Sequence, residues 1–197
     1  MHGSEDLLEL PVNAFLDSLA AEEPAPAGGS GAAVAVAMGA ALLAKVARAS
    51  TGWPEASSVI AQAERLRKRT APLAQRDAEA YEQALAALHL PDQLEPEVRS
   101  LAIGQVVGRA AEVPLVIAEA GADVATLAVL VADRGVADRR GDAVAAALLA
   151  ESGARAAANL VAVNLTMRPE DERVHRAKGL AQVASAAART ALTSPES

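Results

Sequence analysis

The segment from residue 24 to 31 has the residue types that best suit ligand binding. It reads Pro-Ala-Pro-Ala-Gly-Gly-Ser-Gly and leads directly into an apolar stretch that is predicted to be a helix. Glycines before a helix let a ligand approach the backbone, and the free N–H groups of the first turn favour a carboxylate or phosphate. The pattern is equally typical of a tight turn between packed helices. Gly28, Gly29 and Ser30 are therefore candidate binding residues, and Ser30 is also a plausible N-cap.

A second candidate is the polar stretch from residue 135 to 143, which holds two carboxylates and two arginines before a predicted helix. Asp142 can cap that helix, or it can act as a general base if it lies in a cleft. Asp138 is typical of a solvated loop, but a role in substrate binding stays open. The stretch therefore supplies one candidate catalytic carboxylate and one candidate binding carboxylate.

Four polar residues inside predicted helices are further candidates. Asn159 and Asn164 lie in a helix that is otherwise rich in Ala and Val, so a buried amide there must bond either to backbone or to a ligand. Asp77 and Tyr81 are four residues apart and share one helix face. On an exposed face this pair needs no role, but facing the glycine-rich turn it could contact a flat heterocycle.

The composition argues against several classes of function. The chain has no cysteine and three histidines, and these show no metal-ligand spacing, so no metal site is predicted. The net charge is −7, and no basic stripe interleaved with aromatic residues is present, which disfavours nucleic acid as a partner. The N-terminus lacks the pattern of a signal peptide, and the apolar run from Gly31 to Ala44 is shorter than the ~20 residues of a membrane span. We expect a cytoplasmic protein without a membrane partner.

The elements that must position these residues are all predicted to be helices. Hydrophobic residues make up 52% of the chain but aromatic residues only 2%, so the apolar mass is mainly Ala, Val and Leu. No linker divides residues 1–197, which predicts a single all-α domain, a bundle of about six helices, several of them long and kinked at Pro72 and Pro114. An alanine-rich core buries little area per residue, which favours a homo-oligomer. The helices are expected at residues 11–19, 30–49, 54–71, 73–88, 96–132, 142–165 and 169–192.

Taken in order, these segments resemble the formiminotetrahydrofolate cyclodeaminase / methenyltetrahydrofolate cyclohydrolase family, over nearly the whole chain. The family pattern Pro-x-Pro-Gly-Gly-Gly-Ser is similar to residues 24–30, and an Asp-Ala-x-Ala-aromatic segment is similar to residues 77–81. The other similar segments are Val-Pro-Leu at 113–115, Gly-Asp-Ala at 141–143, and the two Asn-Leu pairs at 159–160 and 164–165.

The resemblance implies an all-α homodimer that binds a folate and needs no cofactor beyond a tetrahydrofolate derivative as its substrate. The implied reaction is hydrolysis of 5,10-methenyltetrahydrofolate to 10-formyltetrahydrofolate, which passes through a cationic amidine carbon. In this interpretation Asp142 stabilises that charge and activates water. Gly28 to Ser30 hold polar parts of the folate, while Asn159 and Asn164 contact the pterin or line the site.

The chain also departs from the family pattern at several positions. Ala27 replaces the first glycine of the glycine run, and the family's lysine-rich stretch is replaced by Thr-Gly-Trp-Pro-Glu at residues 51–55. Val136 stands where an Asn is expected, and Gly141 where a Ser is expected. Two alternatives therefore stay open. One is a formiminotetrahydrofolate cyclodeaminase that expels ammonia, ranked second because these residues include no transferase domain. The other is a non-catalytic ligand-binding or assembly protein on the same fold.

Overall fold

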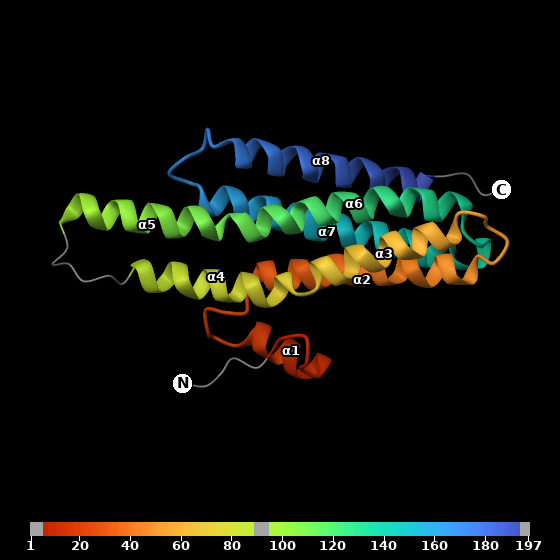
Figure 1. Ribbon diagram of the computed structural model, residues 1–197, viewed down its shortest axis with the longest axis horizontal. Coiled ribbons are helices and arrows are strands. Elements are labelled where there is room, and N and C mark those ends of the chain that lie inside the picture. Colours follow the sequence, from red (N-terminus) through yellow and green to blue (C-terminus); the bar gives the residue numbers. More distant parts are fainter. Residues whose placement is uncertain (1–5, 89–94, 194–197) are drawn as a thin grey trace.

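The computed structural model describes residues 6–88 and 95–193, and all its regular elements in these ranges are helical. They form an elongated bundle (Figure 1). The elements are α1 (Val12–Ala20), α2 (Gly28–Ala49), α3 (Ala56–Thr70), α4 (Leu73–Leu88), α5 (Pro96–Ala110), α6 (Glu112–Arg134), the 3-10 turn η1 (Ala137–Arg139), α7 (Arg140–Asn164) and α8 (Glu172–Thr193).

Two pairs of helices continue each other with a short interruption. α3 and α4 are separated near Pro72, which confirms the predicted break there. α5 and α6 are separated at Ala111, because Pro114 takes a place in the first turn of α6, where a missing N–H costs nothing. When each interrupted pair is counted as one rod, the described residues form six rods, as the sequence predicts.

Some helix starts differ from the sequence prediction. α2 begins at Gly28 rather than at Ser30, and Ala27 occupies its N-cap position. Ser30 does not cap the helix, since its buried hydroxyl instead donates to the Ala74 carbonyl at 2.7 Å. α7 begins at Arg140, so Asp142 lies within its first turn and makes no capping hydrogen bond. In both helices the residue that the sequence predicts as the N-cap lies inside the first turn. Its side chain bonds elsewhere, Ser30 to the Ala74 carbonyl and Asp142 to Lys45.

The core lies between α2, α6 and α7, which pack closely because small residues face one another. A Cβ added to Gly39 would lie 2.9 Å from the Ala146 carbonyl oxygen, and one added to Gly121 would lie 2.9 Å from that of Ala150. Gly153 faces the Ala32 carbonyl at the same distance. Real Cβ atoms do not tolerate such contacts with rigid backbone, so these crossings require glycine.

Two stretches are long and apolar enough to cross a membrane by length and composition. They are α2 and the span Leu101–Arg134, and 61% and 67% of their apolar windows are buried inside the bundle. Each of these stretches is longer than the uncharged run from Gly31 to Ala44, because each also includes a few charged residues. Burial to this extent is typical of core helices.

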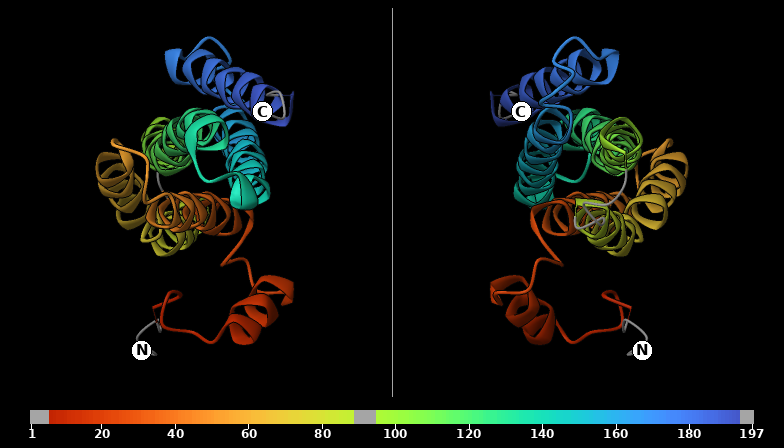
Figure 2. Two further views of the ribbon diagram at one scale, coloured as in Figure 1. Left: turned by 90° about the vertical axis from the view of Figure 1, so that its right-hand side faces the viewer. Right: turned by 90° about the vertical axis from the view of Figure 1, so that its left-hand side faces the viewer.

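The first helix stands apart from the others. α1 lies on the side of the bundle opposite α8, beyond α2 (Figure 2). None of its residues is buried. The segment that joins it to α2 ends at Ala27, which lines the pocket described next.

Candidate functional site

A cavity of about 200 Å³ lies where α2 begins. The first turn of α2, the middle of α4, the junction of α5 with α6, and the last turn of α7 form its walls. It brings together five of the residues that the sequence singles out: Gly28, Gly29, Asp77, Tyr81 and Asn164. Five apolar residues complete the lining: Ala27, Ala110, Pro114, Leu160 and Val163.

Asp77 is the acidic group of this pocket. Its side chain is buried, with 8% of its surface exposed. Burial raises the pKa of Asp77 to about 6, while a hydrogen bond from the Ser30 backbone N–H lowers it. At neutral pH the group is therefore mainly an ionised carboxylate that can take up a proton within the physiological range.

The two pocket glycines have different surroundings. A Cβ on Gly29 would overlap the Asp77 carboxyl group, whereas a Cβ on Gly28 would meet no atom within 4 Å. Gly29 is therefore required for Asp77 to reach the first turn of α2, while Gly28 leaves open space. The sequence predicts an anion at this helix start, and the group found there is the chain's own Asp77, which accepts a hydrogen bond from the Ser30 backbone N–H.

Tyr81 and Asn164 supply the other polar groups. The Tyr81 ring is 40% exposed and lies one turn beyond Asp77 on α4. The Asn164 amide nitrogen donates to the Ala110 carbonyl at 3.1 Å, which ties the end of α7 to the end of α5. Its side-chain oxygen accepts no hydrogen bond from the residues that the structure describes. A carboxylate, a phenol and an amide thus surround a small apolar cavity, an arrangement suited to a flat, polar-edged ligand.

Ser30 and Asn159 do not line this pocket. Ser30 is fully buried behind Asp77, to which it gives its backbone N–H. Asn159 is exposed on α7, five residues before Asn164. Within one chain, Asn159 is exposed and so needs no buried partner for its amide. Asn164 is half-buried, so the expectation that a buried amide must be bonded applies to it only in part.

Asp138 and Asp142 lie in a different hollow at the other end of α7. This hollow measures about 600 Å³ and also includes Ala49 from the end of α2. The Asp142 carboxylate pairs with the Lys45 ammonium at 2.7 Å, and Arg139 lies 4.0 Å from it. Asp142 and Asn164 are both on α7, so the helix rise of ~1.5 Å per residue separates them by about 33 Å. Within one chain, Asp142 cannot reach the pocket at Gly28.

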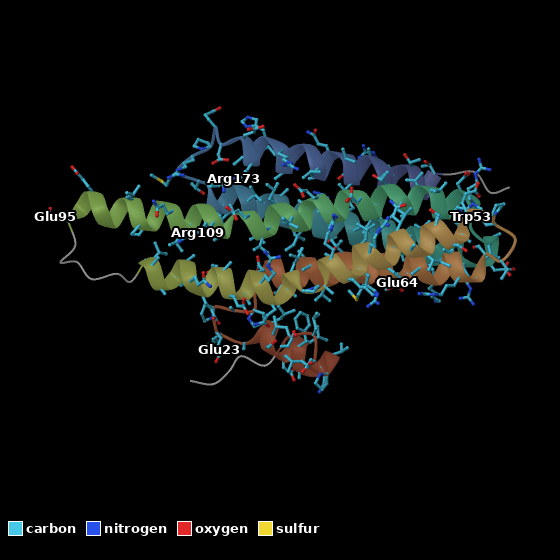
Figure 3. All side chains as sticks on the ribbon, in the orientation of Figure 1. Glu23, Trp53, Glu64, Glu95, Arg109 and Arg173 are labelled. Atoms are coloured by element: carbon cyan, nitrogen blue, oxygen red, sulfur yellow. The ribbon has the colours of Figure 1, made fainter. Side chains whose placement is uncertain are left out.

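A third hollow, of about 400 Å³, borders the second at the same end of the bundle. It includes Trp53 and Arg134, and Figure 3 shows Trp53 far from Arg109 at the pocket end. Ser50 fixes this corner, because its buried hydroxyl donates to the Val46 carbonyl and accepts the Val136 N–H, both at 2.8 Å. Neither Ser50 nor Trp53 stands out in the sequence, since each reads as part of an ordinary turn.

Arg173 holds the pocket wall formed by α5. Its guanidinium donates to the Gly108 carbonyl at 2.6 Å, two residues before Ala110, and lies close to Arg109 in Figure 3. Asp171 accepts three hydrogen bonds from Arg173, two from its side chain and one from its backbone. These bonds lower the pKa of Asp171 to about 2, so the clamp is formed throughout the physiological pH range.

The pocket residues that sequence reasoning missed are the apolar ones. Pro114, Leu160 and Val163 have the residue types of a packed core, and only the meeting of three helix ends shows that they line a cavity. In the part of the chain that the structure describes, no group of three His, Asp or Glu residues could hold a metal ion.

The bundle and its pocket define an all-helical protein with a small, partly polar cavity at its helix ends, and comparison with known proteins identifies its family. The formiminotransferase-cyclodeaminase family matches residues 11–193. A methenyltetrahydrofolate cyclohydrolase from Methylorubrum extorquens is 33% identical over 162 residues, which cover 78% of each chain. The chain belongs to the formiminotransferase-cyclodeaminase family, as the sequence motifs indicate.

A solved structure supports the fold. The formiminotetrahydrofolate cyclodeaminase of Thermotoga maritima matches with a TM-score of 0.83 at 21% identity, covering 94% of this chain and 95% of that one. The all-α bundle predicted from the sequence is thereby confirmed.

Proposed function

We propose that this protein hydrolyses 5,10-methenyltetrahydrofolate to 10-formyltetrahydrofolate. The proposal rests on one observation above all: the Asp77 carboxylate lies in a pocket at the glycine-rich start of α2, beside Tyr81 and Asn164. Family membership and the 33% identical cyclohydrolase favour this reaction over other uses of such a pocket.

The chemistry requires a base near a cationic carbon. Water attacks the carbon that bridges the two folate nitrogens and loses a proton, which gives a neutral carbinolamine. One carbon–nitrogen bond then breaks, that nitrogen takes up a proton, and the hydroxyl group releases its remaining proton to solvent as the formyl carbonyl forms. The Asp77 carboxylate can attract the cation, accept the water proton and return it to the leaving nitrogen, because its pKa of about 6 lies close to neutral pH. Tyr81 and the free oxygen of Asn164 can bind the polar edges of the folate.

The size of the pocket suggests a site completed by a second copy of the chain. Its volume of about 200 Å³ is below the ~300–1,000 Å³ of common ligand sites, so it can enclose only part of a folate. α2 and α7 run antiparallel, with Gly28 and Asn164 at one end and Lys45 and Asp142 at the other. A two-fold axis across the middle of these helices would place Asp142 of a second copy beside the pocket. We propose this homodimer as the arrangement in which Asp142 takes part.

The test of activity is the loss of the methenyl absorption of 5,10-methenyltetrahydrofolate in the near ultraviolet, compared between the wild type and Asp77→Asn. We expect hydrolysis by the wild type and a decrease in kcat of at least about 100-fold in the variant. Release of ammonia from formiminotetrahydrofolate, without methenyl hydrolysis, would assign the cyclodeaminase reaction instead. No turnover and no binding of either folate would leave a non-catalytic role.

Mixing two inactive variants tests the shared site. Asp77→Asn and Asp142→Asn chains should each be inactive alone. A mixed dimer would contain one site with both native carboxylates, so an equal mixture should recover about one quarter of the wild-type activity. Full activity of Asp142→Asn alone would remove Asp142 from the site and leave the Asp77 pocket to act by itself. The cytoplasmic location and the absence of metal, membrane and nucleic-acid partners stay predictions from the sequence.

A further inference from the structure

Arg168 is an exposed arginine in the turn between α7 and α8. In the part of the chain that the structure describes, no hydrogen bond or ion pair joins its side chain to another group. The two acids that act in this region serve Arg173 instead. Asp171 bonds Arg173 with both carboxylate oxygens, and Glu112 acts on Arg173 through its charge. The guanidinium of Arg168 is therefore available to an anion from outside the chain.

Two glycines of α5 form the surface on which this guanidinium lies. A Cβ added to Gly104 would lie 3.1 Å from one Arg168 nitrogen, and a Cβ added to Gly108 would lie 4.0 Å from the other. Arg173 reaches the same stretch, because it donates to the Gly108 carbonyl at 2.6 Å. Of the described residues, Asp171 alone bonds either arginine through a carboxylate. The two arginines thus leave a local positive charge in a chain whose net charge is −7.

A row of residues on α5 connects this place to the pocket. Gly104, Val107 and Ala110 are three residues apart, so they are neighbours on the helix surface. Ala110 lines the pocket, and its carbonyl accepts the Asn164 amide at the end of α7. At ~1.5 Å per residue, Gly104 lies about 9 Å along α5 from Ala110. α5 extends beyond the end of α7, and Val107 is partly exposed there (Figure 1). A ligand that leaves the pocket can therefore follow this row to Arg168.

We propose that Arg168 binds the carboxylates of the glutamate end of the folate and thereby determines the affinity for substrates that carry a glutamate. The inference rests on the hydrolysis proposed above. The pocket of about 200 Å³ encloses only part of a folate, so the glutamate end must lie outside it. An aminobenzoyl group joins the pterin to the glutamate, and this flat group can lie against Val107. A guanidinium can bind a carboxylate through two parallel N–H···O bonds, which offsets the repulsion of the substrate by an acidic protein.

Steady-state kinetics with two substrates test the role of Arg168. Arg168→Gln should raise the KM for 5,10-methenyltetrahydrofolate about tenfold and change kcat less than about twofold, because the contact is the same in the ground state and the transition state. The second substrate is a methenyltetrahydropteroyl amide, in which an uncharged amide replaces the glutamate. Its KM should be the same for the wild type and the variant.

Two further variants separate the contact from a general loss of charge. Arg168→Lys should regain part of the affinity for the glutamate substrate, because lysine keeps the charge but lacks the planar fork. Arg189→Gln is the matched control, since Arg189 is an exposed arginine towards the far end of α8. This variant should keep the wild-type KM for both substrates.

An acid placed on the glycine surface tests the same contact while Arg168 stays in place. The carboxylate of Gly104→Asp should pair with the guanidinium and compete with the glutamate. The KM should therefore rise for the folate but not for the amide. Gly179→Asp is the control, because an added Cβ there meets no atom within 4 Å and Gly179 lies on α8.

The possible results distinguish this inference from the proposed function. An unchanged KM in Arg168→Gln, or an equal rise of KM for both substrates, would overturn the role of Arg168 and leave the proposed hydrolysis intact. Failure of the wild type to hydrolyse either substrate would overturn the proposed function, and the role of Arg168 with it.

Discussion

The carboxyl group of Asp77 lies directly against the Cα of Gly29, so that a side chain on α4 occupies the first turn of α2. The glycine is the only residue type that leaves room for this contact. The glycine-rich loop, the start of α2 and Asp77 therefore form one unit, and a change in any of the three should affect the pocket.

Gly29→Ala is expected to damage this unit, while Gly28→Ala should not. The new Cβ at position 29 would overlap the Asp77 carboxyl group, which should lower the free energy of unfolding by about 1–3 kcal/mol and abolish hydrolysis. At position 28 the Cβ meets open space, so alanine should keep or slightly raise stability through its better helix propensity. Urea unfolding and the methenyl assay measure both effects. Equal behaviour of the two variants would show that Asp77 does not occupy the turn in solution.

The charge on Asp77 should make the protein less stable as the pH rises. Its pKa is raised from 3.8 to about 6, so between about pH 4 and pH 6 the folded state binds more protons than the unfolded chain. The free energy of unfolding should therefore fall by up to about 3 kcal/mol over this window and stay level above it.

Asp77→Asn should remove that slope and leave the protein at least as stable as the wild type at pH 7, although it lowers activity. Urea unfolding at several pH values compares the two proteins. In the wild type, kcat/KM should decrease below about pH 6, where Asp77 takes up a proton. A variant that keeps the wild-type slope would assign the titration to another group.

Ser50→Ala should loosen the corner between α2 and η1. Ser50 is 4% exposed, and its hydroxyl donates to the Val46 carbonyl four residues earlier and accepts the N–H of Val136, 86 residues away. Its loss leaves the Val136 N–H without its acceptor and should cost about 1–3 kcal/mol. Thr126→Ala is the control, because its exposed hydroxyl bonds only to Ala122 in its own helix. Thermal unfolding should show a lower midpoint for the first variant alone.

Arg173→Lys should loosen α5 near Gly108. Lysine cannot reproduce the fork that bonds Asp171 and the Gly108 carbonyl together. Backbone amides near Gly108 should then exchange hydrogen faster, as measured by mass spectrometry. Arg155→Lys, which alters an exposed pair with Glu151, should leave α5 unchanged. Protection of α5 that does not depend on Arg173 would argue against the clamp.

The sequence predicts most of the fold but only part of the site. Helix positions follow from Ala and Leu content and from Pro72, Pro96 and Gly135, which act locally. The pairing of Asp77 with Gly29 joins residues 48 positions apart, and no local pattern specifies it. Asp142 illustrates the same limit: its place in a motif is visible in the sequence, whereas its separation from Gly28 depends on the antiparallel course of α7 and α2.

The glycine and alanine crossings of α2, α6 and α7 have a consequence for how the protein is ordered on folding. Alanine and glycine have no side-chain rotamers to lose, so most of the conformational entropy lost in this core is that of the backbone. Such a core has few alternative ways to repack, because at Gly39, Gly121 and Gly153 the neighbouring backbone is rigid. The bundle should therefore adopt one arrangement with little plasticity, and adaptation to a new ligand should take place mainly at the helix ends.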